Sequence, residues 1–341
     1  MDRTIIATGV LLAGVLAAKP VLAQDLVAQD HVFTVDRPDG HAPSGIKSDF
    51  LLPKGGIYVG YRYFADKYSG SVVGTDAVTT NDVLNVYTVA PVTHNSWTGE
   101  LDVRYGVTNW VTAELSVPWT RNQMVQTTAT SLLNSSSQYI GDVRLRGLFD
   151  LLEEDEYRLS VTVGGSAPTG PIGRRGTAFT GNNQILPFNM QGGSGSWDAL
   201  VGGTFLAQNE TSSVGAQINA VVRFMDNKQD YRLGDEFEFS AWGAINISEW
   251  VSVSMRALYQ HWAAVSGTDA RTDGAIDPLS NPTTTGGERV FIPFGINLYL
   301  REGRAAGHRL SLEFYYPVFE DLNGPHFSAG QTLVISWQAL F

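Results

Sequence analysis

The last fifteen residues of the chain, 327–341, alternate between two kinds of position. Counting back in twos from the terminal phenylalanine gives an apolar series, which is Phe341, Ala339, Trp337, Ile335 and Leu333. The positions between them mix polar and apolar side chains. A period of two predicts a β-strand with one apolar face. A strand of a soluble sandwich has the same alternation, so the upstream chain has to decide which kind of sheet this strand belongs to.

The same alternation recurs along most of the chain, and it predicts an all-β protein. The further segments that show it are 55–68, 96–108, 111–119, 139–151, 157–167, 197–207, 214–224, 237–247, 251–259, 290–300 and 310–318. Tight turns, such as the one at Thr108-Asn109, would join neighbouring segments into hairpins.

The connections between these segments differ in length from one end of the predicted strands to the other. Connections near 109, 153–156, 209–212, 248–249 and 302–307 are short, and most of the others, 120–138, 168–195, 225–234 and 263–288, are longer. Short periplasmic turns and longer outer loops are typical of transmembrane barrels. A separate crossing at the strand-like stretch 82–92 would make the number of strands odd and would break the alternation of short turns and longer loops. We therefore assign this stretch to the first outer loop. We therefore predict a transmembrane antiparallel up-and-down β-barrel of twelve strands over residues 55–341.

The two faces of the predicted strands differ in polarity. One face is apolar over ~9 to 11 residues per strand, which is the length that a tilted strand needs to cross hydrocarbon. In a soluble sandwich the other face would be ordinary surface, and in a membrane barrel it lines the lumen. The charged residues predicted to line the lumen are Arg62, Glu100, Asp102, Arg104, Glu114, Asp142, Arg144, Arg146, Arg158, Arg223, Glu236, Glu238, Arg256, Arg309 and Glu313.

Tryptophans fall at the ends of the predicted strands, where an aromatic girdle of a membrane barrel would lie. They are Trp97, Trp110, Trp119, Trp197, Trp250 and Trp262. Together with the length of the apolar faces, they favour the membrane barrel over the soluble sandwich.

The beginning of the chain has the pattern of an export signal. Arg3 precedes an apolar run over residues 5–18, and Val21-Leu22-Ala23 is a small-residue cleavage pattern, so residues 1–23 are predicted to be a secretory signal peptide. Residues 24–54 are polar and punctuated by proline and glycine, and they are expected to lie in the periplasm or to form a plug in the barrel mouth. The chain has no cysteine, so an exported form would depend on a core or a closed sheet for stability.

The expected location is the bacterial outer membrane, and the expected partners follow from it. The chain ends on an aromatic residue with no polar tail. In this respect the apolar series from Leu333 to Phe341 resembles the assembly signal by which outer-membrane barrels reach the barrel-assembly machinery. Outer-membrane lipid, lipopolysaccharide and a small solute are the other expected partners. A net charge of −11 argues against nucleic acid.

Two loop patterns are weak candidates for ion or phosphate binding. Asp269, Asp273 and Asp277 recur every four residues, whereas a calcium loop needs ligands at alternate positions and a terminal glutamate. A solvated acidic loop is expected, and an adventitious cation site is the alternative. The glycine-rich run Gly192–Ser196 is followed by a strand and lacks the Lys-Ser/Thr pair of a phosphate-binding loop. No metal and no cofactor are predicted.

Catalysis by a serine–histidine pair on the lipid-facing wall is also not expected. His261 projects outward near the end of a predicted strand, and the flanking strands offer it no outward serine or threonine. The chain is therefore predicted not to be an enzyme. Arg174 and Arg175 indicate ordinary surface basicity, with attraction of anionic sugars or lipopolysaccharide phosphates as the alternative.

Several short motifs resemble those of the outer-membrane transporters associated with the meta-cleavage pathway of phenol degradation. The motifs are Leu52-Pro53-Lys54-Gly55, Tyr105-Gly106-Val107-Thr108-Asn109-Trp110, Gly141-Asp142-Val143-Arg144, Ala167-Pro168-Thr169-Gly170 and the run 186–198. The likeness covers residues 52–205. It implies passive uptake of small molecules, aromatic ones among them, and it carries over no binding residue.

Three functions remain open on the sequence. The first is a channel or facilitated-diffusion transporter for small solutes, in which lumen charges set weak ion selectivity and the loops 120–138, 168–195 and 263–288 narrow the mouth. The second is a structural or surface-binding barrel with a closed lumen, and a lipid-acting barrel enzyme is a third and weaker possibility.

Overall fold

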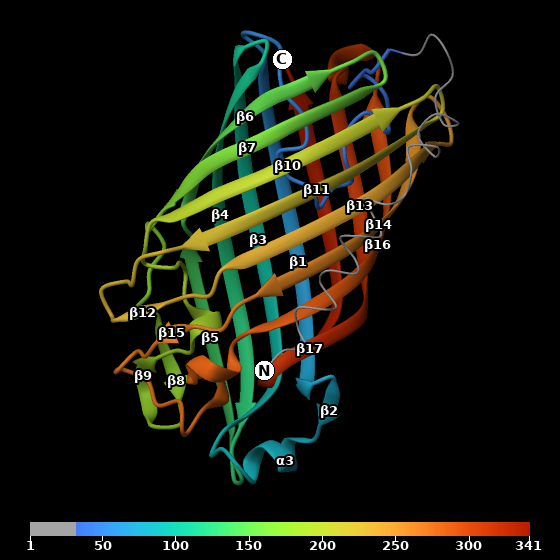
Figure 1. Ribbon diagram of the computed structural model, residues 1–341. Helices are drawn as coiled ribbons and strands as arrows, with labels where there is room; N and C mark the ends of the chain where they lie inside the picture. Colours follow the sequence, from blue (N-terminus) through green and yellow to red (C-terminus); the bar gives the residue numbers. More distant parts are fainter. Residues whose placement is uncertain (1–31) are drawn as a thin grey trace, which may run out of the picture.

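The computed structural model describes residues 32–341, so the predicted signal peptide lies outside the described residues. Antiparallel strands form one tilted, closed sheet (Figure 1). Each strand pairs with its neighbour in chain order, and the last strand pairs with the first, which closes the barrel. The strands of the wall are β1 (Ile57–Gly74), β3 (Ala90–Thr108), β4 (Val111–Thr127), β6 (Val143–Glu153), β7 (Tyr157–Ala167), β10 (Asp198–Gln208), β11 (Ser212–Arg223), β13 (Glu236–Asn246), β14 (Val251–Trp262), β16 (Gly287–Leu300) and β17 (His308–Leu340).

The long strand β17 provides two crossings of the barrel. Its residues 308–322 pair with β16, and its residues 322–340 pair with β1. The ring of His308, at the beginning of β17, lies 5.6 Å from that of Trp337, near its end. Glu320 also accepts a hydrogen bond from the backbone N–H of Ala329 at 3.0 Å. The two halves therefore run back alongside each other, and the wall has twelve crossings, which confirms the predicted all-β barrel.

A belt of exposed apolar side chains surrounds the barrel. On β4, Leu115 is 43% exposed, whereas its neighbours Glu114 and Ser116 are buried inside. Exposed tryptophans bound the belt here, with Trp110 in the short turn before β4 and Trp119 on β4 toward the outer loops. Nine steps of ~3.3 Å at a tilt of ~40° give a belt about 23 Å high, close to the ~25 Å apolar band of outer-membrane barrels. This belt and the closed fold place the protein in a bacterial outer membrane.

Trp262 does not belong to the girdle, contrary to the prediction. Its side chain lies inside the barrel, where its Nε1 donates a hydrogen bond to the carbonyl of Thr285 at 2.6 Å. The guanidinium of Arg289 stacks on its ring at 5.1 Å. The reason is parity, because Trp262 is six residues after the inward-facing Arg256 on the same strand.

The predicted loop 120–138 is mostly strand. β4 continues to Thr127, and β5 (Leu132–Ile140) pairs with its outer half. Beyond Trp119 the outward positions become polar, for example Arg121 and Gln123, which are exposed. A strand outside the lipid needs no apolar face, so the hydrophobic pattern ends although the backbone pairing continues.

Short elements cover the outer end of the barrel. Residues 82–89 lie in the connection between β1 and β3 as predicted, whereas residues 90–92 already belong to β3, which begins at Ala90. In residues 32–341, no helix is long and apolar enough to span a membrane. The outer elements are β2 (Asp76–Val78), α3 (Thr80–Leu84), β8 (Arg175–Ala178), β9 (Gly181–Ile185), η1 (Phe188–Met190), β12 (Tyr231–Arg232), β15 (Ser266–Gly267), η2 (Pro278–Ser280) and η3 (Pro282–Thr284), and η4 (Gly303–Ala305) lies in a short turn.

The position of the apolar belt predicts where an introduced charged side chain destabilises the barrel. Leu115→Arg places a guanidinium in the middle of the belt and should lower the free energy of unfolding by ~2–4 kcal/mol, measured by equilibrium denaturation in lipid vesicles. The matched control is Leu132→Arg, because Leu132 is 64% exposed on β5, beyond the belt. This control should cost ~1 kcal/mol or less. Equal losses for the two variants would contradict the placement of the membrane.

Candidate functional site

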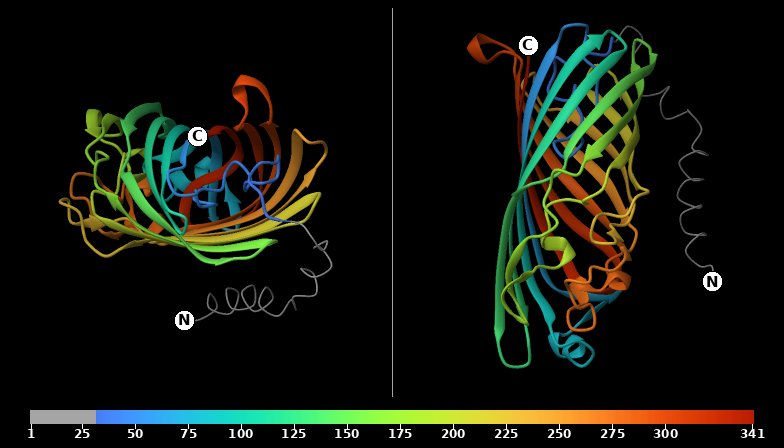
Figure 2. Two further views of the ribbon diagram at one scale, coloured as in Figure 1. Left: turned by 90° about the horizontal axis from the view of Figure 1, so that it is seen from above. Right: turned by 90° about the vertical axis from the view of Figure 1, so that its left-hand side faces the viewer.

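Residues 33–54, called the inner segment below, lie inside the end of the barrel that carries the short turns (Figure 2, left). The backbone N–H of Phe33 bonds to the carbonyl of Asp155, in the turn between β6 and β7. Further along, the segment contributes an apolar cluster to the lumen. The cluster contains Ala42, Ile46, Phe50 and Leu52 of the segment with Tyr58, Leu206 and Trp242 of the wall.

Arginines of the wall satisfy backbone carbonyls of the inner segment. Arg309 donates hydrogen bonds to the carbonyls of Val35, Arg37 and Pro38. Arg62 donates to the carbonyls of Ser44 and Ile46, each at 3.1 Å, and forms an ion pair with Asp102. Buried backbone carbonyls need such partners, and this segment forms no strand or helix that would supply them.

Carboxylates of the wall bind the same segment. Glu114 accepts hydrogen bonds from Ser48 Oγ at 2.7 Å, from Arg104 Nε at 2.7 Å and from Arg146 at 2.8 Å. Arg104 also pairs with Asp49 of the inner segment at 3.1 Å. Two further contacts are Lys47 with Glu100 at 2.7 Å and the N–H of Gly45 with Glu313 at 2.8 Å.

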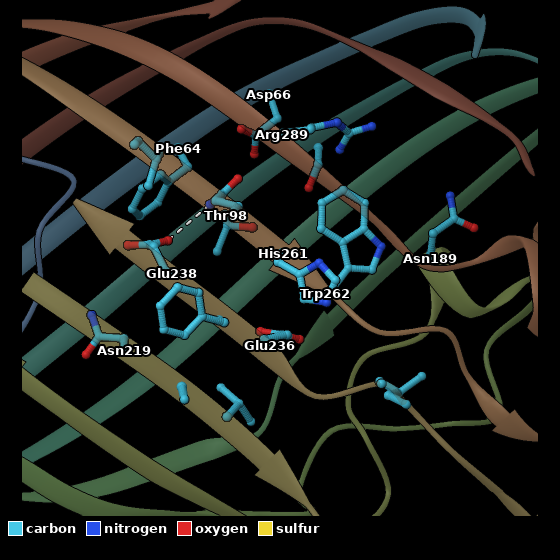
Figure 3. Close-up of a pocket in the computed structure, with 18 of the residues that line it drawn as sticks. Phe64, Asp66, Thr98, Asn189, Asn219, Glu236, Glu238, His261, Trp262 and Arg289 are labelled. Atoms are coloured by element: carbon cyan, nitrogen blue, oxygen red, sulfur yellow. Dashed lines mark hydrogen bonds between the residues drawn. The ribbon is translucent and has the colours of Figure 1, made fainter. Parts of the chain in front are cut away.

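Above the inner segment lies a cavity of about 740 Å³. Gly45, Lys47 and Ser48 of the inner segment form part of its lining. Side chains from opposite parts of the wall point into it, as Figure 3 shows for Phe64 and Glu238. The remaining aromatic residues of the lining include Tyr68, Tyr139, Phe188, Trp262, Phe291, Tyr315 and Phe327.

The structure divides the predicted lumen residues into two groups and leaves two aside. Around the inner segment lie Arg62, Glu100, Asp102, Arg104, Glu114, Arg309 and Glu313. Lining the cavity are Arg144, Arg146, Arg223, Glu236, Glu238 and Arg256.

Arg158 and Asp142 lie elsewhere. Arg158 lies at the turn between β6 and β7, where it pairs with Glu153 at 3.0 Å and covers the ring of Phe33 at 4.9 Å. Asp142 is buried at a break between β5 and β6, where its two carboxylate oxygens accept the N–H groups of Gly170 and Ser194, each at 2.8 Å. Neither is a cavity charge in this structure.

Three of the motifs quoted above meet at Asp142. Thr169 receives the N–H of Val143 at 2.9 Å and donates to the carbonyl of Gly141 at 2.9 Å. A Cβ on Gly170 would lie 2.3 Å from a backbone oxygen of Gly192, so only glycine allows this approach. The motifs therefore have a structural explanation, which is the attachment of the loop after β7 to the wall.

Two charged residues of the cavity wall were missed, Arg289 because the predicted strand 290–300 began too late, and Asp66 although it lies within the predicted strand 55–68. Asp66 accepts a hydrogen bond from Thr332 at 2.7 Å, and Arg289 lies over Tyr68 at 5.2 Å and pairs with Glu320 at 3.3 Å. Asp66 has the inward parity of Arg62 on the same strand, and Arg289 has the inward parity of Phe291. Continuing the two-residue alternation along each strand would therefore have found both.

The predicted assembly residues lie on the outer face of the final strand, next to β1. Ile335 and Phe341 are exposed, Leu333 and Trp337 are half-buried, and Ala339 is covered. Trp337 Nε1 donates to His308 at 3.0 Å.

The outer connection 263–286 is attached across the mouth. The carbonyl of Ile276 accepts the N–H groups of Thr88 and Val89, each at 3.1 Å. Asp277 accepts a hydrogen bond from Gln126 at 2.9 Å and caps η2 through the N–H of Leu279. Burial raises the pKa of Asp277 to about 6. In the part of the chain that the structure describes, no three candidate ligands gather into a metal site.

The fold can be compared with solved structures. An outer-membrane channel from Pseudomonas putida F1 superposes with a TM-score of 0.59, at 16% identity, over 87% of this chain and 99% of that one. This chain has the fold of an outer-membrane channel. A Pseudomonas aeruginosa FadL homologue (TM-score 0.42, 10% identity, 92% of this chain and 99% of that one) and the Ralstonia pickettii toluene transporter TbuX (0.43, 10%, 91% and 100%) are more distantly similar. No family model and no curated protein matches the sequence.

Glu114 links the inner segment to the wall, and its charge can be removed with little change of shape. Glu114→Gln leaves Arg104 and Arg146 without their shared carboxylate, so amides 42–52 should exchange hydrogen roughly tenfold faster or more, measured by mass spectrometry. The control is Glu249→Gln, because Glu249 forms an exposed pair with Arg301 and should change nothing. Unchanged exchange in the Glu114 variant would contradict this anchoring.

Asp277 makes the outer connection sensitive to pH. Its folded pKa of about 6 is raised from 3.8, so its stabilising contribution is complete below about pH 4 and is lost as the pH rises through 6. Amides 276–279 should be less protected at pH 7.5 than at pH 5, after correction for the intrinsic exchange rate. Asp277→Asn should remove this difference, and a variant that keeps it would show that another group is responsible.

Proposed function

We propose that this protein is a channel for passive uptake of small solutes across the outer membrane, aromatic and hydrophobic compounds among them. The observation that carries the proposal is the cavity of about 740 Å³ inside a membrane barrel. Its volume is in the range of ligand-binding pockets, and its aromatic lining suits molecules with an apolar ring. The motif likeness to transporters associated with phenol degradation supports the same class of solute.

In this proposal the inner segment is a plug. It lies between the cavity and the periplasmic end, and its contacts with Arg309, Arg62 and Glu114 must loosen before a solute can pass. The charges around the cavity would then order water and give weak ion selectivity. The extensive contacts of the inner segment also favour the alternative, a surface-binding barrel whose lumen stays closed.

Two further roles belong to the proposal. The outward apolar residues of the final strand would be recognised by the barrel-assembly machinery, since Ile335 and Phe341 remain exposed on the folded barrel. The protein would carry out no catalysis. His261 lies 4.0 Å from Glu288, and Tyr259 donates to the same carboxylate at 2.6 Å, an arrangement without a nucleophilic serine.

A reversible cross-link can test whether the plug must move. Ser44 of the inner segment and Ser336 of β17 have their hydroxyl oxygens 2.8 Å apart, and the chain has no cysteine of its own. The variant Ser44→Cys with Ser336→Cys should show no conductance steps in a planar bilayer when oxidised, and steps should appear after reduction. The matched control joins two wall strands, Ser252→Cys with Asn297→Cys, and should conduct in both states.

The two unfavourable outcomes have different meanings. Equal conductance of the oxidised and reduced variant would show that the inner segment is not a plug. If the properly folded variant shows no conductance in either state, and the wild type shows none, the protein is not a channel. The closed, surface-binding barrel then remains.

A further inference from the structure

Arg144 differs from the other cations of the cavity because it has no ion pair. It lines the cavity from β6, between Ser116 of β4 and Ser166 of β7. Its Nε is buried without a hydrogen-bond partner. Within residues 32–341, no carboxylate oxygen lies within ion-pairing distance of its guanidinium.

The neighbouring cations are all neutralised by a carboxylate of the wall. The pairs are Lys47 with Glu100, Arg146 with Glu114, Arg223 with Asp198 and Glu236, Arg256 with Glu313, and Arg289 with Glu320. Glu100 and Glu236 lie near enough for their charges to interact with that of Arg144, but each makes its close ion pair with another cation, so Arg144 is left without a direct partner.

The carboxylates that line the cavity are occupied by other groups. Glu236 pairs with Arg223 at 2.8 Å, and Glu238 accepts a hydrogen bond from Gln260 at 3.1 Å (Figure 3). Both belong to β13, whereas Arg144 belongs to β6. Asp66 accepts from Thr332. A carboxylate in direct contact with the Arg144 guanidinium would therefore come from a ligand.

A partly buried guanidinium without a partner costs free energy, and an anionic ligand would offset this cost. The planar guanidinium fork binds a carboxylate with two parallel hydrogen bonds. An ammonium group could not provide this geometry, so the residue type itself favours a planar anion.

The remainder of the lining favours a ring on that anion. Phe64, Phe188 and Phe291 line the same cavity. Arginines lie over Tyr68, Trp262 and Tyr315, at 5.2, 5.1 and 4.9 Å, and Lys47 lies over Phe64 at 5.5 Å. Within residues 32–341 no cation lies over Phe188 or Phe291, so these two phenylalanines offer aromatic surface for stacking or edge-to-face contact.

The geometry points to a small aromatic carboxylate as the occupant of the cavity, with its carboxylate on Arg144 and its ring among the phenylalanines. This inference rests on the proposed uptake function and names the substrate class.

Binding can be measured separately from transport. Benzoate, benzamide, acetate and inorganic phosphate are titrated into the purified full barrel in detergent by isothermal calorimetry. Benzoate should bind more tightly than the other three compounds. Arg144→Gln should weaken benzoate binding roughly 10- to 100-fold, the loss expected for a charge-assisted hydrogen bond, and should leave benzamide unchanged.

Two further variants control for folding and for charge. Arg144→Lys keeps the charge but not the fork and should bind benzoate with intermediate affinity. Arg301→Gln removes an exposed arginine that pairs with Glu249 and should bind benzoate like the wild type. Heat-modifiable migration in gels establishes that each variant is folded.

Several results would overturn the inference. They are absence of benzoate binding to the wild type, equal affinity for benzamide, and an Arg144→Gln variant with unchanged affinity. If acetate or phosphate binds as tightly as benzoate, the site is a general anion site, and the inference that the ligand is aromatic is wrong. Benzoate binding that depends on Arg144, in a barrel that never conducts, would contradict the uptake function and leave the binding site intact.

Discussion

Hydrocarbon offers no hydrogen-bond partner, so each backbone N–H and C=O of a membrane strand has to be satisfied within the sheet. The pairing of β1 with the second half of β17, from Tyr58 with Leu340 upward, meets this requirement at the two edges that would otherwise remain open. Closure after an even number of crossings brings both chain ends of the barrel to the side of the short turns. The inner segment therefore reaches the lumen from that side, and the cavity is left between it and the outer loops.

The same requirement operates inside the barrel. The inner segment forms no regular secondary structure, yet it lies in a lumen where water is largely replaced by protein. Arg309 and Arg62 of the wall supply donors for its carbonyls, and its N–H groups donate to Glu313 of the wall and to Asp49 of the segment itself. Much of the charge on the inner wall is thus explained by the binding of this segment. The binding of this segment does not explain Arg144, because this residue faces the cavity.

The barrel could be predicted from the sequence because its cause is local. Alternation with period two assigns each side chain to the lipid or to the lumen, and the lengths of the connections give the direction of each strand. This reasoning failed where the lipid ends, as in β5, whose outward positions are mostly polar.

The partners of each charge could not be predicted, because they lie on distant parts of the chain. Asp142 has the inward parity of a lumen residue, but it binds the loop after β7, and Arg158 lies at a turn beside Phe33. Trp262 shows the opposite error, since its residue type suggested the girdle although its parity was inward. Where type and parity disagree, parity is the better guide, because it follows from the backbone.

The cavity and the inner segment are connected through Glu114 of the wall, and in the proposed channel this connection would limit how a solute could open the lumen. Glu114 binds Ser48 of the inner segment with one carboxylate oxygen, and the same oxygen accepts from Arg146. Arg146 also lines the cavity. An anion that attracts Arg146 would compete with Glu114 and weaken this contact, whereas a neutral solute would leave it unchanged. The charge of a solute, and not only its size, therefore bears on whether the inner segment loosens, because the lumen holds that segment mainly with charged groups.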